Sequence, residues 1–363
     1  MRATVLGGSA KGNATRVLDI DAGFPLSPAV SAEPLAQGAA SAPTAAIPAE
    51  VQDDLARVEE RLLAEIASRE PRLGEIAHHL VGAGGKRVRP LVVLLVFHAT
   101  TVPGRARRDD VIEAAVALEL IHSATLLHDD IIDRGETRRG RPSALARFGL
   151  PDTLVAGDFL FSRAFALCAR FEAEIVRWAA EACVGLTEGE VLQGRRRRDP
   201  AASVADYDEI ILRKTASLFA VGARTAAYLA GAPSPVVEAM DACGRHVGLA
   251  FQMHDDLLDV EGQPAVTGKP RGIDLRDGNP SLPIVLALAR DPELQRLFAT
   301  PGLPTAEIER GLARIRRSGV LPVVAARAAA ELEEAVAAID TLRPSPARSA
   351  LHVFARTLAE RRA

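Results

Sequence analysis

The sequence predicts an all-α protein, a large single-domain helical bundle, and three observations support that prediction. Apolar residues recur at helical spacing along most of the chain from Val51 onward. Pro or Gly residues stand at the breaks between these periodic segments. Alternating strand patterns and strand-turn-strand signals are absent, and no repeat with a period of about 20–50 residues indicates a solenoid.

Two regions follow one another along the chain. Residues 1–49 are rich in Ala, Gly, Pro and Ser and show little periodicity, so we predict a disordered or loosely packed arm. Residues 50–363 form the predicted all-α domain, whose first helix lies within 51–68, where acids come early in an apolar-periodic segment. A glycine-rich turn then precedes a helix that opens at Pro90 and contains the apolar block 91–97.

The remaining elements follow the same pattern of apolar periodicity between Pro or Gly breaks. Many of them are apolar on more than one face, as expected for central helices of a large bundle. Helical segments are expected at 109–133, 152–193, 203–231, 234–261, 281–290, 305–317, 320–341 and 346–361. The breaks between segments carry Pro103 with Gly104, Pro151, Pro200, Pro233, Pro264, Pro270, Pro301 and Pro344.

Composition narrows the classes of function. Of 363 residues, 48% are hydrophobic and 25% are charged, the balance of a soluble globular protein with a sizeable core. The 44 basic residues do not exceed the 47 acidic ones, so we expect no nucleic-acid partner. The three cysteines lack disulfide or metal-ligand spacing, and no signal pattern or membrane-length apolar run occurs. We therefore predict a cytoplasmic protein without a transmembrane segment.

The stretch LLHDDIIDRGETRRGRPS at 126–143 concentrates charge at the end of an apolar segment. Asp129 and Asp133 are one helical turn apart with Asp130 beside them, so like charges share one face and repel each other. By itself, such a cluster favours the interpretation of a solvated helix end.

A second cluster changes that interpretation. FQMHDDLLD at 251–259 gives Asp255, Asp256 and Asp259 the same spacing, again inside an apolar helix and again after a histidine. On facing helices the two clusters would form an acidic rim, and hard carboxylate oxygens suit Mg²⁺, whose coordination substrate phosphates usually complete. Because carboxylates cannot bind a diphosphate directly, the pattern indicates a diphosphate bound through magnesium.

Basic residues accompany the acidic clusters. Arg138 and Arg139 follow the first cluster, and GGKRVRP supplies Lys86, Arg87 and Arg89 beside a glycine pair. Arg offers phosphate oxygens a planar fork, and Lys offers them a compact charge. The segment is not a Walker loop, because GxxxxGK[ST] is absent, and alone it would be a basic turn. In combination it suggests a second, metal-free diphosphate pocket.

In this order the motifs resemble the trans-isoprenyl diphosphate synthases, especially the long-chain polyprenyl ones. The resemblance runs from about residue 81 to 286 through GGKRVRP, ELIHSATLLHDDIIDRGETRRGRPS, GDFLFSRAF, EGEVLQ, KTASLF, FQMHDDLLD, GKPRGIDL and GNPSLP. It implies a helical bundle of the isoprenoid synthase type with a central active-site cavity. It also implies Mg²⁺-dependent, head-to-tail condensation of isopentenyl diphosphate with an allylic diphosphate, by a homodimer with three Mg²⁺ ions per active site.

The resemblance also implies roles for individual side chains. The expected magnesium ligands are Asp129, Asp133 and Asp255, supported by Asp130, Asp256 and Asp259. The expected contacts of isopentenyl diphosphate are Lys86, Arg89, His122 and Arg139. The expected contacts of the allylic diphosphate are Arg138, Lys214, Thr215, Gln252 and Lys269. The expected catalytic residues are Asp129, Asp133, Asp255, Lys214 and Arg138. Taken singly, His122 would be a core histidine, Lys214 and Thr215 a surface pair, and Gln252 a buried amide.

Product length is expected to depend on residues just before the first aspartates. Ala124 and Thr125 are both small, whereas short-chain members of the family usually carry an aromatic there or an insertion within the aspartate motif. The resemblance therefore implies a long tunnel and a product beyond C20, such as a quinone side chain. Leu118 and Ile121 are possible deeper stops. A geranylgeranyl or farnesyl diphosphate synthase is the alternative.

Some features depart from the family pattern or stay outside it. Asn279 stands where the family commonly has a lysine before the Leu-Pro pair, which removes a positive charge near the allylic diphosphate. The arginine run 195–198 is interpreted as a solvated charge run, with transient contact to an anionic membrane surface during product release as a lesser alternative. A terpene cyclase would lack the second aspartate cluster, and a head-to-head synthase would lack GGKRVRP. A catalytically silent subunit of a heteromeric synthase remains an alternative because of Asn279.

Overall fold

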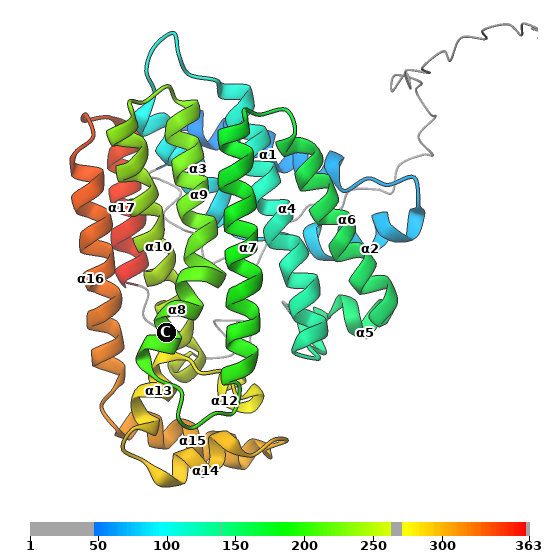
Figure 1. Ribbon diagram of the computed structural model, residues 1–363, viewed down its shortest axis with the longest axis vertical. Helices are drawn as coiled ribbons and strands as arrows, with labels where there is room; N and C mark the ends of the chain where they lie inside the picture. The colour runs from blue at the N-terminus through cyan, green and yellow to red at the C-terminus, as the bar shows by residue number, and fades with distance from the viewer. Residues whose placement is uncertain (1–46, 139, 263–270, 361–363) are drawn as a thin grey trace, which may run out of the picture. The chain divides into compact units, whose positions relative to one another are not determined.

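Helices make up almost all of the described structure (Figure 1). The computed structural model describes residues 47–138, 140–262 and 271–360, which lie within one compact unit, Ser41–Ala363. The predicted all-α fold is confirmed. The helices are α1 (Ala49–Glu65), α2 (Pro71–Val81), α3 (Val88–Thr100), α4 (Arg108–Ile132), α5 (Ala144–Phe148), α6 (Leu150–Cys168), α7 (Ala173–Arg196), α8 (Val204–Ile211), α9 (Ser217–Leu229), α10 (Ser234–Glu261), α12 (Ile273–Asp277), α13 (Leu282–Leu288), α14 (Pro292–Ala299), α15 (Thr305–Arg317), α16 (Leu321–Asp340) and α17 (Pro346–Glu360).

Four helices, α2, α5, α12 and α14, lie where none was predicted, and the observed elements differ from the predicted ones in three further places. The segment 152–193 is two helices, α6 and α7, because the chain turns at 169–172 without a Pro or Gly to mark the break. The segment 203–231 is α8, a π-helical turn (Leu212–Ala216) and α9. A hairpin of β1 (Thr137–Arg138) and β2 (Arg141–Pro142) follows α4, and strands of two residues are too short to produce an alternating pattern.

Two long helices position the site: α4 has 25 residues and α10 has 28. Helix α4 packs against α3, α6 and α9, and α10 packs against α9 and α16 (Figure 1). Fully buried residues such as Ala115, Leu120 and Leu127 lie on several faces of α4, as its continuous apolar sequence predicts. Among the described helices, α4 is long and apolar enough to cross a membrane, but 72% of its apolar window is buried inside the protein. It is therefore a core helix.

The second aspartate cluster lies where α10 passes from one hydrophobic core to another. The larger core is formed by α1 to α4, α6, α7, α9, α16 and α17, together with the N-terminal part of α10 up to Ala250. The smaller core gathers α8 and α12 to α16 around the last turns of α10, starting at Met253. The aspartates at 255–259 are thus carried by a helix that is held firmly on both sides of them.

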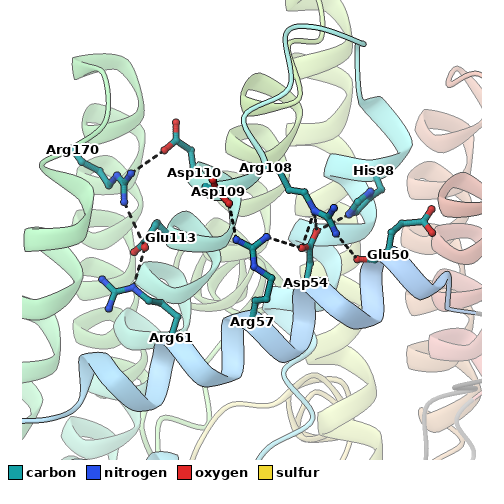
Figure 2. Close-up of polar contacts among 10 residues, drawn as sticks. All are labelled: Glu50, Asp54, Arg57, Arg61, His98, Arg108, Asp109, Asp110, Glu113 and Arg170. Carbon is teal, nitrogen blue, oxygen red and sulfur yellow. Dashed lines mark hydrogen bonds and ion pairs between the residues drawn. The ribbon is translucent and has the colours of Figure 1, made fainter.

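A buried aspartate anchors α1 to α3 and α4 (Figure 2). The Asp54 side chain is fully buried, accepts a bifurcated hydrogen bond from Arg108 Nε at 3.0 Å from Oδ1 and 2.9 Å from Oδ2, and lies 2.9 Å from His98 Nε2. Arg57 lies 3.3 Å from the same carboxylate and pairs with Asp109 at 2.6 Å. Because a buried carboxylate without partners would be strongly destabilising, this cluster determines where α1 packs.

Candidate active site

The first aspartate cluster divides between two environments. Asp129, on the last turn of α4, and Asp133, its C-cap, are partly exposed, with side chains 20% and 31% accessible. Asp130 is buried on another face, where its Oδ1 accepts hydrogen bonds from Arg138 Nε at 2.8 Å and Nη2 at 2.7 Å. The i, i+4 spacing therefore predicts correctly which two carboxylates share a face. Asp130 instead fixes the hairpin that carries Arg138.

The second cluster divides in a similar way. Asp255 is exposed, whereas Asp256 is buried and accepts hydrogen bonds from Gln252 Nε2 at 2.9 Å and from the backbone N–H that opens α13 at 3.1 Å. Asp259 accepts from the two backbone N–H groups that open α12, at 2.9 and 3.1 Å. These two carboxylates therefore hold α12 and α13 in place, a favourable use of negative charge at helix N-termini.

Burial disfavours the charged form of several carboxyl groups in the site. Burial first, opposed by Lys214, and then the neighbouring Glu190 and Asp133 together raise the pKa of Asp129 to about 6. Burial is also the first cause of a raised pKa at three more carboxyls, Asp256, Asp259 and Asp274. Such a concentration of carboxylates is stabilised by a cation.

The carboxylates of the site are donors that suit Mg²⁺. Within the described residues, no group of three or more His, Cys, Asp or Glu side chains is placed to hold a metal ion without other ligands. The partly exposed carboxylates of Asp129 and Asp133, and the exposed one of Asp255, are hard oxygen donors in surplus. They fit an ion that keeps several waters and takes its remaining oxygens from a substrate diphosphate.

A π-helical turn places two predicted substrate contacts beside the aspartates. Lys214 Nζ lies 3.5 Å from Asp129 Oδ1, donates to Gln193 Oε1 at 2.8 Å and pairs with Glu190. Thr215 Oγ1 donates to the Gln252 side-chain oxygen at 2.9 Å, and Gln252 in turn donates to Asp256. The turn therefore connects both aspartate clusters, in keeping with the frequent occurrence of π-helical turns at functional sites.

In the basic segment GGKRVRP, one residue has a structural role and two remain candidates for ligand binding. Arg87, with φ of 43°, is buried and binds Glu59 at 2.7 and 2.9 Å and Glu119 at 3.0 Å, so it anchors the segment and is unavailable to a ligand. Lys86 is exposed. Arg89 stacks over the Phe219 ring at 4.9 Å, and burial lowers its pKa.

An apolar cavity lies along α4, towards its N-terminus from the aspartates. Its walls come from α3, α4, α7 and α9 and from the end of α6, and they include Leu118 and Ile121, the two deeper stops named from the sequence. Its volume is about 30 Å³, enough for roughly two water molecules by the same measure. Ala124 is fully buried and, like Thr125, is not part of the wall; the Thr125 hydroxyl donates to the His122 carbonyl at 2.7 Å.

Comparison with known proteins identifies the site's family. Residues 70–308 match the Polyprenyl synthetase family. Octaprenyl diphosphate synthase of Haemophilus influenzae is 37% identical over 303 residues, which cover 82% of this chain and 91% of the relative. The chain belongs to the polyprenyl synthetase family. As a member of this family it is a prenyltransferase, as the order of its motifs predicts.

Two further members of the polyprenyl synthetase family agree over most of their length. Heptaprenyl diphosphate synthase component 2 of Geobacillus stearothermophilus is 36% identical over 318 residues, covering 86% of this chain and 97% of the relative. The crystal structure of a polyprenyl synthase from Caulobacter crescentus, complexed with calcium and isoprenyl diphosphate, matches with a TM-score of 0.82. It is 36% identical, and the match covers 86% of this chain and 96% of that one. The isoprenoid synthase fold is therefore confirmed.

The polyprenyl synthetase site contains residues to which the sequence reasoning assigned no role. Glu190 and Gln193 belong to the block EGEVLQ and contact Lys214; their i, i+3 spacing on one helical face was the available signal. Arg197 Nη2 lies 2.5 Å from Asp133 Oδ1. No local pattern distinguishes this arginine from the three beside it.

The interpretation of 195–198 as a solvated charge run is wrong for three of its four residues. Arg196, Arg197 and Arg198 are half-buried and each has an acidic or carbonyl partner. Arg195 is exposed. A run whose guanidinium groups are already bound is a poor membrane-contact patch. Two predicted substrate contacts, Arg139 and Lys269, lie outside the described residues.

Proposed function

We propose that this prenyltransferase condenses isopentenyl diphosphate with an allylic diphosphate to build a polyprenyl diphosphate longer than C20. The observation that carries the proposal is the Lys214–Asp129 contact near Asp133, with an apolar cavity walled by α4. The relatives named octaprenyl and heptaprenyl diphosphate synthase support a long product. The absence of an aromatic at Ala124 and Thr125 supports it too.

Asp129, Asp133 and Asp255 would hold Mg²⁺, three ions per site in the loaded enzyme. Bound magnesium supplies Lewis-acid neutralisation of the diphosphate leaving group. Asp130, Asp256 and Asp259 act in support: Asp256 and Asp259 fix α13 and α12, and Asp130 fixes the β1–β2 hairpin.

The protein's own groups bind and orient the two diphosphates. Lys214, Thr215, Gln252, Arg138 and Lys269 are the proposed allylic contacts, and Lys86, Arg89, His122 and Arg139 the proposed contacts of isopentenyl diphosphate. The side-chain hydrogen bond from Thr215 orients the Gln252 amide, since its oxygen is the acceptor and its NH₂ donates to Asp256. The departing pyrophosphate is the proposed proton acceptor. The apolar cavity therefore supplies no base; it positions the growing chain and excludes water.

A second copy of the chain is the proposed partner of α6 and α7. Exposed apolar side chains line these two helices: Leu154, Val155, Phe165, Val184 and Val191, with 43 to 59% of each accessible. Exposed apolar side chains concentrated on two helices are typical of an interface between subunits. Replacing Val184 by Glu should convert a dimer to a monomer in sedimentation analysis, and an unchanged mass would contradict this interface.

One assay tests the proposed reaction. Purified protein is incubated with Mg²⁺, labelled isopentenyl diphosphate and a farnesyl or geranylgeranyl primer, and the products are sized by chromatography. We expect products longer than C20. Product that stops at C15 or C20 would favour the farnesyl or geranylgeranyl synthase alternative. No elongation with any primer would favour the silent subunit.

A further inference from the structure

The end of α7 is fixed against the rest of the site. In the run 195–198, Arg196 pairs with Asp206 at 2.9 Å. The backbone N–H of Arg198, a residue with φ of 60°, donates to the carbonyl of Gly278 at 2.8 Å. In Figure 1 the end of α7 accordingly meets the turn after α12. The backbone of the arginine between these two anchors therefore has little freedom to move.

That intervening arginine, Arg197, is aimed at a candidate metal ligand. Its Nη2 lies 2.5 Å from Asp133 Oδ1, and its Nη1 lies 3.5 Å from the carbonyl of Ile132, at the end of α4. Its buried Nε has no hydrogen-bond partner within the described structure. An unpartnered buried donor is costly, so the present arrangement leaves part of the guanidinium unsatisfied.

The pairing competes with a metal at the same oxygen. A metal ion at Asp133 Oδ1 and a guanidinium at hydrogen-bond distance from that oxygen are two cations on one acceptor, so ligand binding must loosen the ion pair. The loosened guanidinium remains at the mouth of the site, because its neighbours hold the backbone. Its planar set of donors matches the oxygens of a diphosphate.

We propose that Arg197 is a further substrate-binding residue, which neutralises Asp133 before the ligands bind and then turns to the diphosphate of the allylic substrate. This rests on the proposed function. The anchor of Arg198 on Gly278 places the run beside Asn279, the position at which the sequence lacks an expected positive charge. Arg197 thus supplies a cation on that side of the site.

Two binding measurements on the full-length protein test the proposal without turnover. Mn²⁺ binding is followed by electron paramagnetic resonance in the absence of diphosphate, and binding of inorganic pyrophosphate at saturating Mg²⁺ is followed by calorimetry. For Arg197→Gln we expect Mn²⁺ to bind about three- to tenfold more tightly, because its competitor is gone. We expect pyrophosphate to bind about tenfold or more weakly, because charge-assisted hydrogen bonds are lost.

The matched control is Arg195→Gln, which removes the same charge from the exposed member of the run. It should change either affinity by less than about twofold, because exposed charges are screened. Arg197→Lys should retain part of the pyrophosphate affinity and is the second variant if Arg197→Gln does not fold. Unchanged affinities in the Arg197 variants, or equal changes in the Arg195 variant, would overturn the proposal. If the unaltered protein does not bind pyrophosphate with Mg²⁺, the proposed function itself fails.

Discussion

Lys214 Nζ lies 3.5 Å from Asp129 Oδ1, across the gap between the π-helical turn and the end of α4. The same ammonium group pairs with Glu190 and donates to Gln193, both on α7. Burial opposes the charge on Lys214, but Asp129 and Glu190 outweigh burial and raise its pKa. The Lys214 ammonium group therefore links the π-helical turn, α4 and α7 at the place where the diphosphate leaving group is expected.

Replacing Lys214 by Gln should lower kcat/KM for the allylic diphosphate by about 100-fold, because the ion contributes about 2–3 kcal/mol to binding of the transition state. Steady-state kinetics with a varied primer measures the effect. The matched control is Arg213→Gln, since Arg213 is the preceding residue and pairs with Glu188 and Glu209 at the surface. An equal loss in both variants would indicate a general disturbance of the π-helical turn.

Asp129 should make the metal-free protein less stable as the pH rises. Its pKa is raised to about 6, mainly by burial, so the unfolded chain gives up the proton at lower pH than the folded protein does. Below the pKa that Asp129 has in the unfolded chain, this carboxyl group does not lower the free energy of unfolding. The penalty to the free energy of unfolding grows as the pH rises to about 6 and then stays constant. Asp129→Asn should therefore stabilise the chelator-treated protein by about 3 kcal/mol at pH 8 and have little effect at pH 4.

Thermal unfolding at the two pH values measures this difference, with Glu136→Gln as a control at an exposed carboxylate nearby. The Asn variant should also lose prenyl transfer. Stabilisation that is the same at both pH values would mean that removal of the charge is not the cause.

The absence of a side chain at Gly222 should be needed for the present width of the apolar cavity. A Cβ atom at this position would lie 2.7 Å from Leu118 Cδ2 and 2.9 Å from Val93 Cγ2, so a methyl group there would force these two cavity-wall side chains to shift where α3, α4 and α9 meet. Gly222→Ala should shorten the products, and Leu118→Ala should lengthen them. Chromatographic sizing of the products measures both effects.

The control for this pair is Gly185→Ala on α7, where an added Cβ would meet nothing within 4 Å. Its product lengths should equal those of the unaltered enzyme. Product length that responds to neither cavity residue would mean that the growing chain takes another path.

Asp54 should be among the residues whose loss destabilises the fold most. Asp54→Ala removes the buried acceptor shared by Arg108 and His98, and the loss of hydrogen bonds between charged groups costs about 1.5–3 kcal/mol. Urea unfolding measures the change. Asp53→Ala, at the exposed neighbouring position on α1, should stay within about 0.5 kcal/mol. If both variants lose equal stability, the loss of negative charge near the N-terminus of α1, rather than the Asp54 cluster, would be responsible.

Local periodicity was enough to predict much of the fold and part of the site. Helical spacing of apolar residues and Pro or Gly breaks predicted the all-α class, and α4, α10 and α15 to α17 lie within a few residues of their predicted bounds. The i, i+4 relation of Asp129 and Asp133 predicted a shared face, because that relation depends only on the geometry of one helix. The order of the motifs was sufficient for the family.

Only the tertiary structure decided which charges compensate one another. Asp130 and Asp133 have similar sequence surroundings, yet one is buried against Arg138 and the other meets Arg197, more than 60 residues away. The same holds for the four arginines of 195–198, of which packing leaves one exposed and directs one into the site. The reason is physical: secondary structure follows from neighbours along the chain, whereas the partner of a buried charge is determined by which distant helices pack together.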